Sequence, residues 1–343
     1  MTDTNNKAGS KVLAAGVLVV VAMAIVGAGA WFVLGPGSGS GVDEAQAAQN
    51  PANEATPAHA IEAALGAAAS YRSSEEFAKA EAVLRAAVEE HVEDQGLRLA
   101  YAEVLMDLQK IEQAYEQYEA ALAIGPRDPQ IELNAGTLAM TIGNRERALE
   151  HYSMARTAEP GSAQIALYLG AVQHQLGMQS EAKASLLAAL QLDESSAEAS
   201  SMLAQIYLDE NDAEVALGFI RRARGAEPAQ VAHRILEARI LRRLNKPEEA
   251  LTLLMALPEG ELYQPMVLEL CSASMGLLNQ RAEAAELYER AMELNPGEPD
   301  FAFQAAQWHE RAGNTDRAEE LAKRASMMGH EQAKRMADRL AEG

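Results

Sequence analysis

The amino-acid sequence predicts an all-α protein built mainly from repeated helical hairpins. One observation is a column of alanines that recurs every 34 residues, which is typical of a repeat architecture. Another is that each period holds two apolar-periodic stretches of about 14 residues, separated by a short polar turn. The third is composition, because only 5% aromatic residues with abundant alanine favours thin, closely packed helices. The column consists of Ala80, Ala114, Ala148, Ala182, Ala216, Ala250, Ala284 and Ala318.

A membrane anchor is expected before the repeats. Residues 12–34 contain 23 residues without a charge, and at about 1.5 Å per residue they can cross a hydrocarbon layer of about 30 Å. Lys7 and Lys11 precede this segment and acidic residues follow it, so the positive-inside rule predicts a cytoplasmic tail at 1–11. A cleaved secretory signal ending near residues 45–47 is the alternative, and both interpretations export the rest of the chain.

The predicted localisation is therefore the bacterial cytoplasmic (inner) membrane. The protein would be single-pass, with its N-terminus inside and its repeats periplasmic or extracytoplasmic. Residues 35–57 are dense in Gly, Ser, Pro and Ala, lack large apolar residues except Val42, and predict a flexible linker.

Two further columns keep the 34-residue period and predict where the helices of a hairpin touch, because only small side chains allow two helix axes to approach closely. One lies seven residues after the first column and the other lies twelve residues before it. Their members are Ala87, Ala121, Ala155, Ala189, Ala223, Leu257, Ala291 and Ala325, and Ala68, Ala102, Gly136, Gly170, Ala204, Ala238, Ser272 and Ala306.

The third repeat shows the elements expected in each hairpin. Residues 131–142 predict the first helix, residues 143–146 the turn, and residues 147–159 the second helix, which ends before Pro160. Residues that tolerate positive φ are expected where the first helix ends. They are Gly143, Gly177, Asn211, Asn245, Asn279 and Gly313.

This pattern resembles the tetratricopeptide repeat (TPR). The residues that carry the resemblance are Gly136, Gly143, Ala148, Tyr152, Ala155 and Pro160 in the third repeat, and Leu169, Gly170, Gly177, Ala182, Ala189 and Leu190 in the fourth. The resemblance implies a right-handed superhelical solenoid of eight helical hairpins over residues 61–332, preceded by the transmembrane helix and closed by a capping helix at 331–342. The repeats are 61–94, 95–128, 129–162, 163–196, 197–230, 231–264, 265–298 and 299–332.

The sixth repeat departs from the pattern. Leu257 replaces the small residue of its column and Pro258 follows directly, where a proline would break the last turn of the second helix. We therefore expect a shortened second helix and a looser junction at 257–263.

Several function classes are disfavoured. A formal net charge of −21 argues against nucleic-acid binding through a basic face. Residues outside the repeats leave no room for a catalytic domain, and the scattered histidines show no pair at metal-ligand spacing. We expect no enzyme activity, no cofactor and no metal, and we expect the single cysteine, Cys271, to be buried and inert.

The resemblance implies that a partner peptide or helix lies along a concave groove lined by the first helices. The candidate groove residues are mostly apolar or adaptable, and the Lys and Asn set that grips a terminal carboxylate in some family members is absent. They are Leu65, Leu99, Glu103, Met106, Leu133, Thr137, Met140, Leu167, His174, Gln205, Arg239, Arg242 and Arg243.

The last three candidates belong to a cluster of seven arginines in the fifth and sixth repeats, together with Arg221, Arg222, Arg224 and Arg234. Arg239, Arg242 and Arg243 are expected to face the groove, where they could bind an acidic peptide or an anionic headgroup. The alternative is that these arginines pair with Glu237, Glu248 and other carboxylates of the neighbouring repeats.

These features together predict a non-catalytic interaction scaffold or assembly factor tethered to the membrane, with a protein or peptide ligand in the groove. A holdase-like factor in export or cytochrome c maturation is a narrower version of the same hypothesis. The rival from another class is a self-assembling structural envelope protein that forms homo-oligomers.

Overall fold

The computed structural model describes residues 56–342, which form helices joined by short turns, without a strand in that range. The predicted tail at 1–11, the predicted anchor at 12–34 and nearly all of the predicted linker lie outside the described residues. Pro57, the last residue of the predicted linker, already begins a helix. Within residues 56–342, no helix combines the length and the apolar character needed to cross a membrane.

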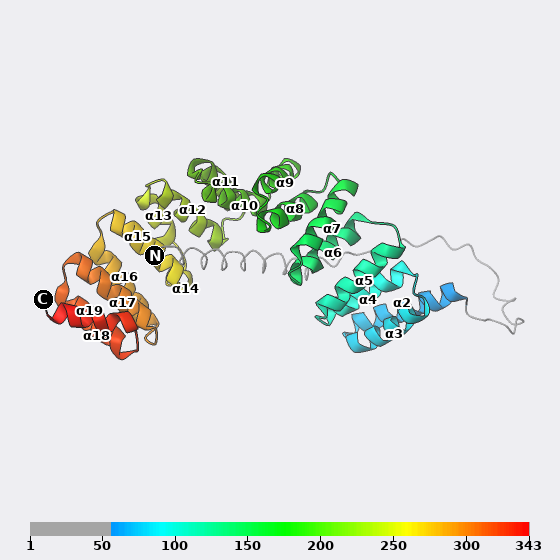
Figure 1. The fold of residues 1–343 in the computed structure, drawn as a ribbon, viewed down its shortest axis with the longest axis horizontal. Helices are drawn as coiled ribbons and strands as arrows, with labels where there is room; N and C mark the ends of the chain where they lie inside the picture. The colour runs from blue at the N-terminus through cyan, green and yellow to red at the C-terminus, as the bar shows by residue number, and fades with distance from the viewer. Residues whose placement is uncertain (1–55, 343) are drawn as a thin grey trace, which may run out of the picture. The chain divides into compact units, whose positions relative to one another are not determined.

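The helices pair into consecutive hairpins (Figure 1), and the chain divides into two compact units, of which the first ends at Pro160 and the second begins at Gly161. The N-terminal unit contains α2 (Pro57–Ser73), α3 (Phe77–Glu90), α4 (Gln95–Asp107), α5 (Ile111–Ile124), α6 (Pro129–Thr141) and α7 (Arg145–Ala158). The C-terminal unit contains α8 (Ala163–Gln175), α9 (Gln179–Leu192), α10 (Ala197–Asp209), α11 (Ala213–Ala226), α12 (Val231–Arg243), α13 (Pro247–Met255), α14 (Glu259–Leu262), α15 (Pro265–Leu277), α16 (Arg281–Leu294), α17 (Pro299–Ala312), α18 (Thr315–Met327) and α19 (Glu331–Ala341).

Short polar side chains start several of the first helices. The Asp94 carboxylate accepts a hydrogen bond from the backbone N–H of Leu97, and Asp128, Ser162 and Ser196 cap α6, α8 and α10 in the same way. Each cap satisfies a backbone donor that the first turn of a helix leaves without a partner.

The members of the three columns are buried except for the half-buried Ala87, and in the α6–α7 and α8–α9 hairpins they lie at the contact between the two helices, as the sequence predicts. All eight alanines of the first column are fully buried. At Gly136 the helices approach so closely that an added Cβ would lie 2.5 Å from the Tyr152 ring, and at Gly170 it would lie 2.7 Å from Leu186 Cγ. A glycine in α6 thus makes room for a large aromatic side chain on α7.

Each first helix ends on a residue with positive φ, and the structure confirms all six predicted positions. Glu75 and Gln109 adopt the same conformation in the first two repeats, with φ of 58° and 57°. At Gln109, the next backbone N–H, of Lys110, donates to the Leu105 carbonyl, which closes the helix end by a Schellman motif. The conformation therefore follows from the repeat position, even where the residue type does not favour it.

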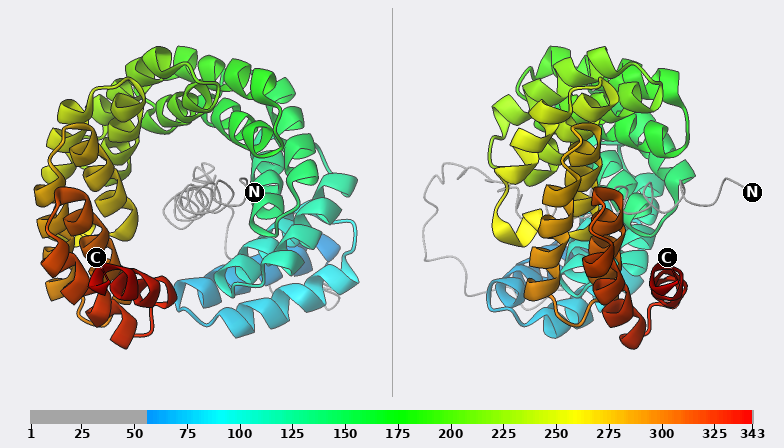
Figure 2. Two further views of the ribbon diagram at one scale, coloured as in Figure 1. Left: turned by 60° about the vertical axis from the view of Figure 1, so that its left-hand side comes forward. Right: turned by 90° about the vertical axis from the view of Figure 1, so that its left-hand side faces the viewer.

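The first helices of neighbouring hairpins approach one another more closely than the second helices do. Contacts join α2 to α4 in the N-terminal unit, and α8 to α10, α10 to α12 and α12 to α15 in the C-terminal unit. We call the surface that the first helices present within each unit the first-helix face. Figure 2 shows the two rows of helices from two further sides.

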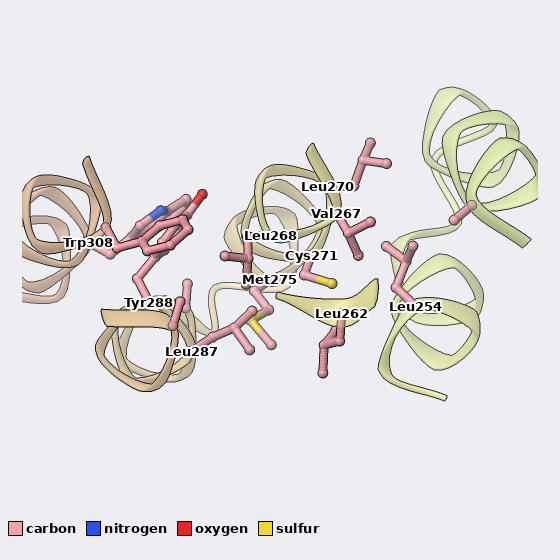
Figure 3. Packing of buried hydrophobic residues seen from close by; sticks show 14 of the residues in the cluster. Leu254, Leu262, Val267, Leu268, Leu270, Cys271, Met275, Leu287, Tyr288 and Trp308 are labelled. Carbon is pink, nitrogen blue, oxygen red and sulfur yellow. The ribbon is translucent and has the colours of Figure 1, made fainter. Parts of the chain in front are cut away.

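The sixth repeat has the shortened second helix that the sequence predicts, because α13 ends at Met255. The predicted looser junction at 257–263 stays a prediction, since residues 258–261 are exposed whereas Leu257 and Leu262 on either side are buried. The one-turn helix α14 follows, and Leu257 and Leu262 are both buried in one hydrophobic cluster. Figure 3 shows Leu262 of this cluster together with Leu254 and Cys271. The segment after Pro258 thus replaces the packing that the missing helical turn would have supplied.

Ion pairs join the second helices of neighbouring hairpins at one fixed pair of repeat positions. Which of the two positions carries the arginine and which the glutamate varies between repeats. Arg147 pairs with Glu119, Arg221 with Glu249 at 3.3 Å, and Arg317 with Glu289 at 2.8 Å. The middle pair has its charges exchanged relative to the other two. His309 Nε2 also lies 2.6 Å from Glu289 Oε1. Hydrogen bonding from Arg317 is the main cause that lowers the pKa of Glu289.

The last helix, α19, covers the end of the C-terminal unit. It buries Ala333, Met336 and Ala337, while Arg339 binds Glu310 with both terminal nitrogens at 2.5 and 3.0 Å. That bidentate contact lowers the pKa of the Glu310 carboxyl.

Replacing Gly136 by leucine is expected to destabilise the protein by about 1–3 kcal/mol, the usual cost of overpacking a core. The matched control is Gly66→Leu on α2, where an added Cβ meets nothing within 4 Å. This control should be neutral or stabilising by up to about 1 kcal/mol, because glycine weakens a helix interior. Urea unfolding followed by circular dichroism measures both variants, and equal effects at the two sites would contradict the packing described for the hairpins.

Replacing Glu289 by glutamine is expected to cost up to about 1 kcal/mol at pH 7, the range of partly exposed ion pairs. Because the folded pKa of Glu289 lies below its ordinary value of 4.5, its contribution is complete above that value and is lost as the pH falls through the lowered pKa. The difference in unfolding free energy between the variant and the wild type should therefore shrink on acidification. Glu320→Gln, at an exposed carboxylate that also contacts Arg317, is the control and should have little effect. A Glu289→Gln difference that persisted unchanged at acidic pH would contradict this account.

Candidate functional site

The first-helix face of the N-terminal unit is apolar and partly open. Leu65, Leu99 and Met106 are half-buried, pack against the core beneath them and keep part of their surface in solvent. Met140 is likewise half-buried on α6. Methionine and leucine in such positions can adapt to apolar side chains of a partner.

Two of the predicted groove residues lie in the core instead. Leu133 and Thr137 on α6 are buried, with exposed fractions of 3% and 6%. The Thr137 hydroxyl donates to the Leu133 carbonyl and accepts a hydrogen bond from the Tyr152 hydroxyl at 3.2 Å. Both side chains therefore stabilise the hairpin and present no surface to a partner.

Glu103, also predicted to line the groove, is exposed but already has a partner. Arg72 Nη1 lies 2.5 Å from Glu103 Oε2, and Arg72 Nε lies 2.7 Å from Asp107 Oδ2. Burial of this guanidinium lowers the pKa of Arg72, but the hydrogen bonds and charges of the two carboxylates outweigh that effect, so the pKa is raised overall. One arginine of the first repeat thus holds two carboxylates of the second.

The first-helix face of the C-terminal unit is more polar. Leu167 and His174 on α8 are half-buried, and His174 Nδ1 lies 3.1 Å from Gln179 Oε1. Gln205 on α10 donates from Nε2 to Asp209 Oδ1 at 2.7 Å, which orients its carbonyl oxygen away from that carboxylate.

Four of the seven clustered arginines are bound by the fold itself. Arg221 and Arg224 both pair with the carboxylate of Glu237, which is only 1% exposed, at 3.0 and 2.6 Å. Arg222 donates to the Glu194 carbonyl, and Arg234 donates to the Pro228 carbonyl. Glu237, which the sequence offers as a partner for Arg239, Arg242 and Arg243, is thus paired with Arg221 and Arg224 instead, and Arg221 also contacts Glu249.

Among residues 56–342, the hydrogen bonds of Arg239 and Arg243, two of the three arginines predicted to face a partner, go to neutral amide oxygens. Arg239 Nη1 donates to Gln205 Oε1 at 3.5 Å, and Arg243 donates to Asn211 Oδ1 from Nε at 3.1 Å and from Nη2 at 2.7 Å. Arg242 is exposed. Burial lowers the pKa of Arg239, and the field of Asp209 opposes that shift. Sequence reasoning missed the interactions of Asp209 with Arg239 and of Asn211 with Arg243, because they join residues of two different repeats.

A second buried polar network lies in the N-terminal unit. His151 Nδ1 is 2.8 Å from Glu132 Oε2, and His151 Nε2 is 3.0 Å from Glu119 Oε1. Arg127 adds a contact to Glu132 at 3.1 Å. Because the buried polar atoms of Glu132 and His151 find partners within the hairpins, the network has a structural explanation.

Cys271 is fully buried, and desolvation raises the pKa of its thiol to about 12. The thiolate needed for nucleophilic chemistry is therefore disfavoured. Among residues 56–342, no group of three or more His, Cys, Asp or Glu side chains has an arrangement that could hold a metal ion.

Comparison with known proteins identifies the repeat. Family models of the tetratricopeptide repeat match residues 71–134, and residues 133–197 and 278–326. A model of the anaphase-promoting complex, cyclosome, subunit 3, matches residues 178–257. No curated protein sequence matches the chain.

Solved structures show the same fold at low sequence identity. A tetratricopeptide repeat protein from Parabacteroides merdae is 15% identical, with a TM-score of 0.52 over 83% of this chain and 99% of that one. PilF of Pseudomonas aeruginosa is 19% identical, with a TM-score of 0.52 over 63% of this chain and 99% of its own. The helical hairpins of this chain are therefore tetratricopeptide repeats.

Proposed function

We propose that this chain is a protein-interaction scaffold without catalytic chemistry of its own, which binds partner peptides or helices on its first-helix faces. The observation that carries this proposal is the row of partly open apolar side chains on α2, α4 and α6. Leu65, Leu99 and Met106 pack on the core, and they and Met140 are half-buried, so that each keeps part of its surface in solvent. An amphipathic helix or an extended segment could bury its own apolar side chains there.

The same proposal includes a membrane tether at residues 12–34, with the repeats outside the bacterial cytoplasmic membrane. It is supported by the length of the uncharged segment and by the lysines that precede it. The linker at 35–57 would separate the repeats from the membrane surface. The partner that such a scaffold holds decides whether it acts as an assembly factor or as a holdase for exported proteins.

Photocrosslinking in intact cells tests which face binds. A photoreactive residue at Met106 or at Met140 is expected to crosslink the same partner protein, because both positions lie on the first-helix face. The matched control is Met154, a methionine on α7 that is 42% exposed. Mass spectrometry of the products identifies the partner. Crosslinks that form from Met154 and from neither first-helix position would contradict the proposed binding face.

A further inference from the structure

In the part of this acidic chain that the structure describes, no carboxylate forms an ion pair with Arg239, Arg242 or Arg243 on α12. Arg239 and Arg243 use neutral amide oxygens of α10 and of the turn that follows it, and no ion pair forms with Arg242 among the described residues. A guanidinium has five N–H donors, so Arg239 keeps four donors beyond its bond to Gln205. Arg242 and Arg243 lie in the last turn of α12, where a cation suits the helix dipole, but that interaction uses none of their side-chain N–H groups.

The first repeat shows how an arginine at this repeat position binds carboxylates. Arg72 lies near the end of the first helix of its hairpin and contacts Glu103 and Asp107, four residues apart on the next first helix. The two acidic side chains project from one face of α4, because residues at i and i+4 lie one helical turn apart.

Arg242 occupies the same repeat position without those carboxylates. It follows Arg72 by 170 residues, which is five periods of 34. The residues that correspond to Glu103 and Asp107 are Ala273 and Leu277 on α15, the next first helix. Ala273 is small and half-buried, and Leu277 is 58% exposed, so neither adds a charge or covers the arginine.

We propose that Arg239, Arg242 and Arg243 form a binding site for an acidic peptide segment that carries two carboxylates about one helical turn apart. The two carboxylates take the places that Glu103 and Asp107 hold around Arg72. This inference deepens the proposed function and rests on it, because it requires that the first-helix face binds partners.

A peptide fits this site better than a membrane surface does. Arg239 is half-buried on α12, beside Gln205 and Asp209 of α10, and the two helices are in contact. A narrow chain can bring a carboxylate to that guanidinium, whereas a flat layer of headgroups would first meet the exposed Arg242 and Arg243. Partial burial also strengthens the attraction, because water screens a desolvated charge pair less than an exposed one.

The test measures binding of the purified full-length chain, in mild detergent, to a fluorescein-labelled alanine-based peptide. The peptide has about 15 residues, the length at which such a helix becomes stable, with one Glu and one Asp four positions apart. A control peptide carries Gln and Asn at those positions. Fluorescence anisotropy should show binding of the acidic peptide at least about tenfold tighter than that of the control, and the difference should fall as salt rises.

Two pairs of variants locate the site. Arg239→Gln with Arg242→Gln should weaken acidic-peptide binding at least about tenfold, whereas Arg324→Gln with Arg335→Gln, two exposed arginines on α18 and α19, should leave it unchanged. Ala273→Glu with Leu277→Asp should also abolish binding, because it supplies internal carboxylates at the positions that Glu103 and Asp107 hold beside Arg72. Its control, Leu192→Glu with Met327→Asp, adds the same charge at exposed positions elsewhere and should retain binding.

The outcomes separate this inference from the proposed function. Unchanged peptide binding in the Arg239→Gln/Arg242→Gln variant, or binding of anionic phospholipid vesicles in place of the peptide, overturns the acidic-peptide site. If the acidic-peptide site fails this test but Met106 and Met140 still crosslink the partner, the proposed binding face remains valid without that site. If the wild type shows neither peptide binding nor crosslinks from Met106 and Met140, both the acidic-peptide site and the proposed binding face are overturned.

Discussion

The close approach of the two helices in every hairpin is the constraint on which the rest of the structure depends. It requires a small residue at three fixed positions in nearly every repeat, and the alanines of the first column have no exposed surface at all. Gly136 and Gly170 show how little space is left, because even a methyl group there would collide with the partner helix. A large side chain fits between the two helices of a hairpin where the facing residue is small, as Tyr152 does against Gly136. The low aromatic content follows from the same geometry.

A fixed backbone repeat lets side-chain chemistry change without changing the fold. The second-helix ion pairs keep one geometry while Arg221 and Glu249 exchange the charges of Glu119 and Arg147. The first-helix face behaves similarly, since Arg72 of the first repeat pairs with two carboxylates of the second, whereas the equivalent Arg242 of the sixth repeat has no such carboxylates on the next first helix. In such a protein the departures from the repeat, more than the repeat itself, distinguish one surface from another, and they are where a specific partner would be recognised.

Features that recur with the period could be predicted from the sequence. The helices of the third repeat, the buried small columns and the positive φ of Asn211 and its equivalents all follow from spacing and residue type. Features that depend on contacts between repeats could not be predicted from the sequence. Glu75 and Gln109 give no sign of a left-handed conformation, because tertiary position imposes it. The burial of Leu133 and Thr137, and the pairing of Arg221 and Arg224 with Glu237, depend on how neighbouring helices rotate against each other.

Hydrogen exchange of the full-length chain, followed by mass spectrometry with and without the doubly acidic peptide, tests the central claim most directly. That claim is that the hairpins leave the first-helix face free for partners. The account predicts slower exchange in the C-terminal turns of α10 and α12, around Gln205–Asp209 and Arg239–Arg243, while α9 and α11 remain unchanged. Protection confined to the second helices, with none on α10 or α12, would contradict it.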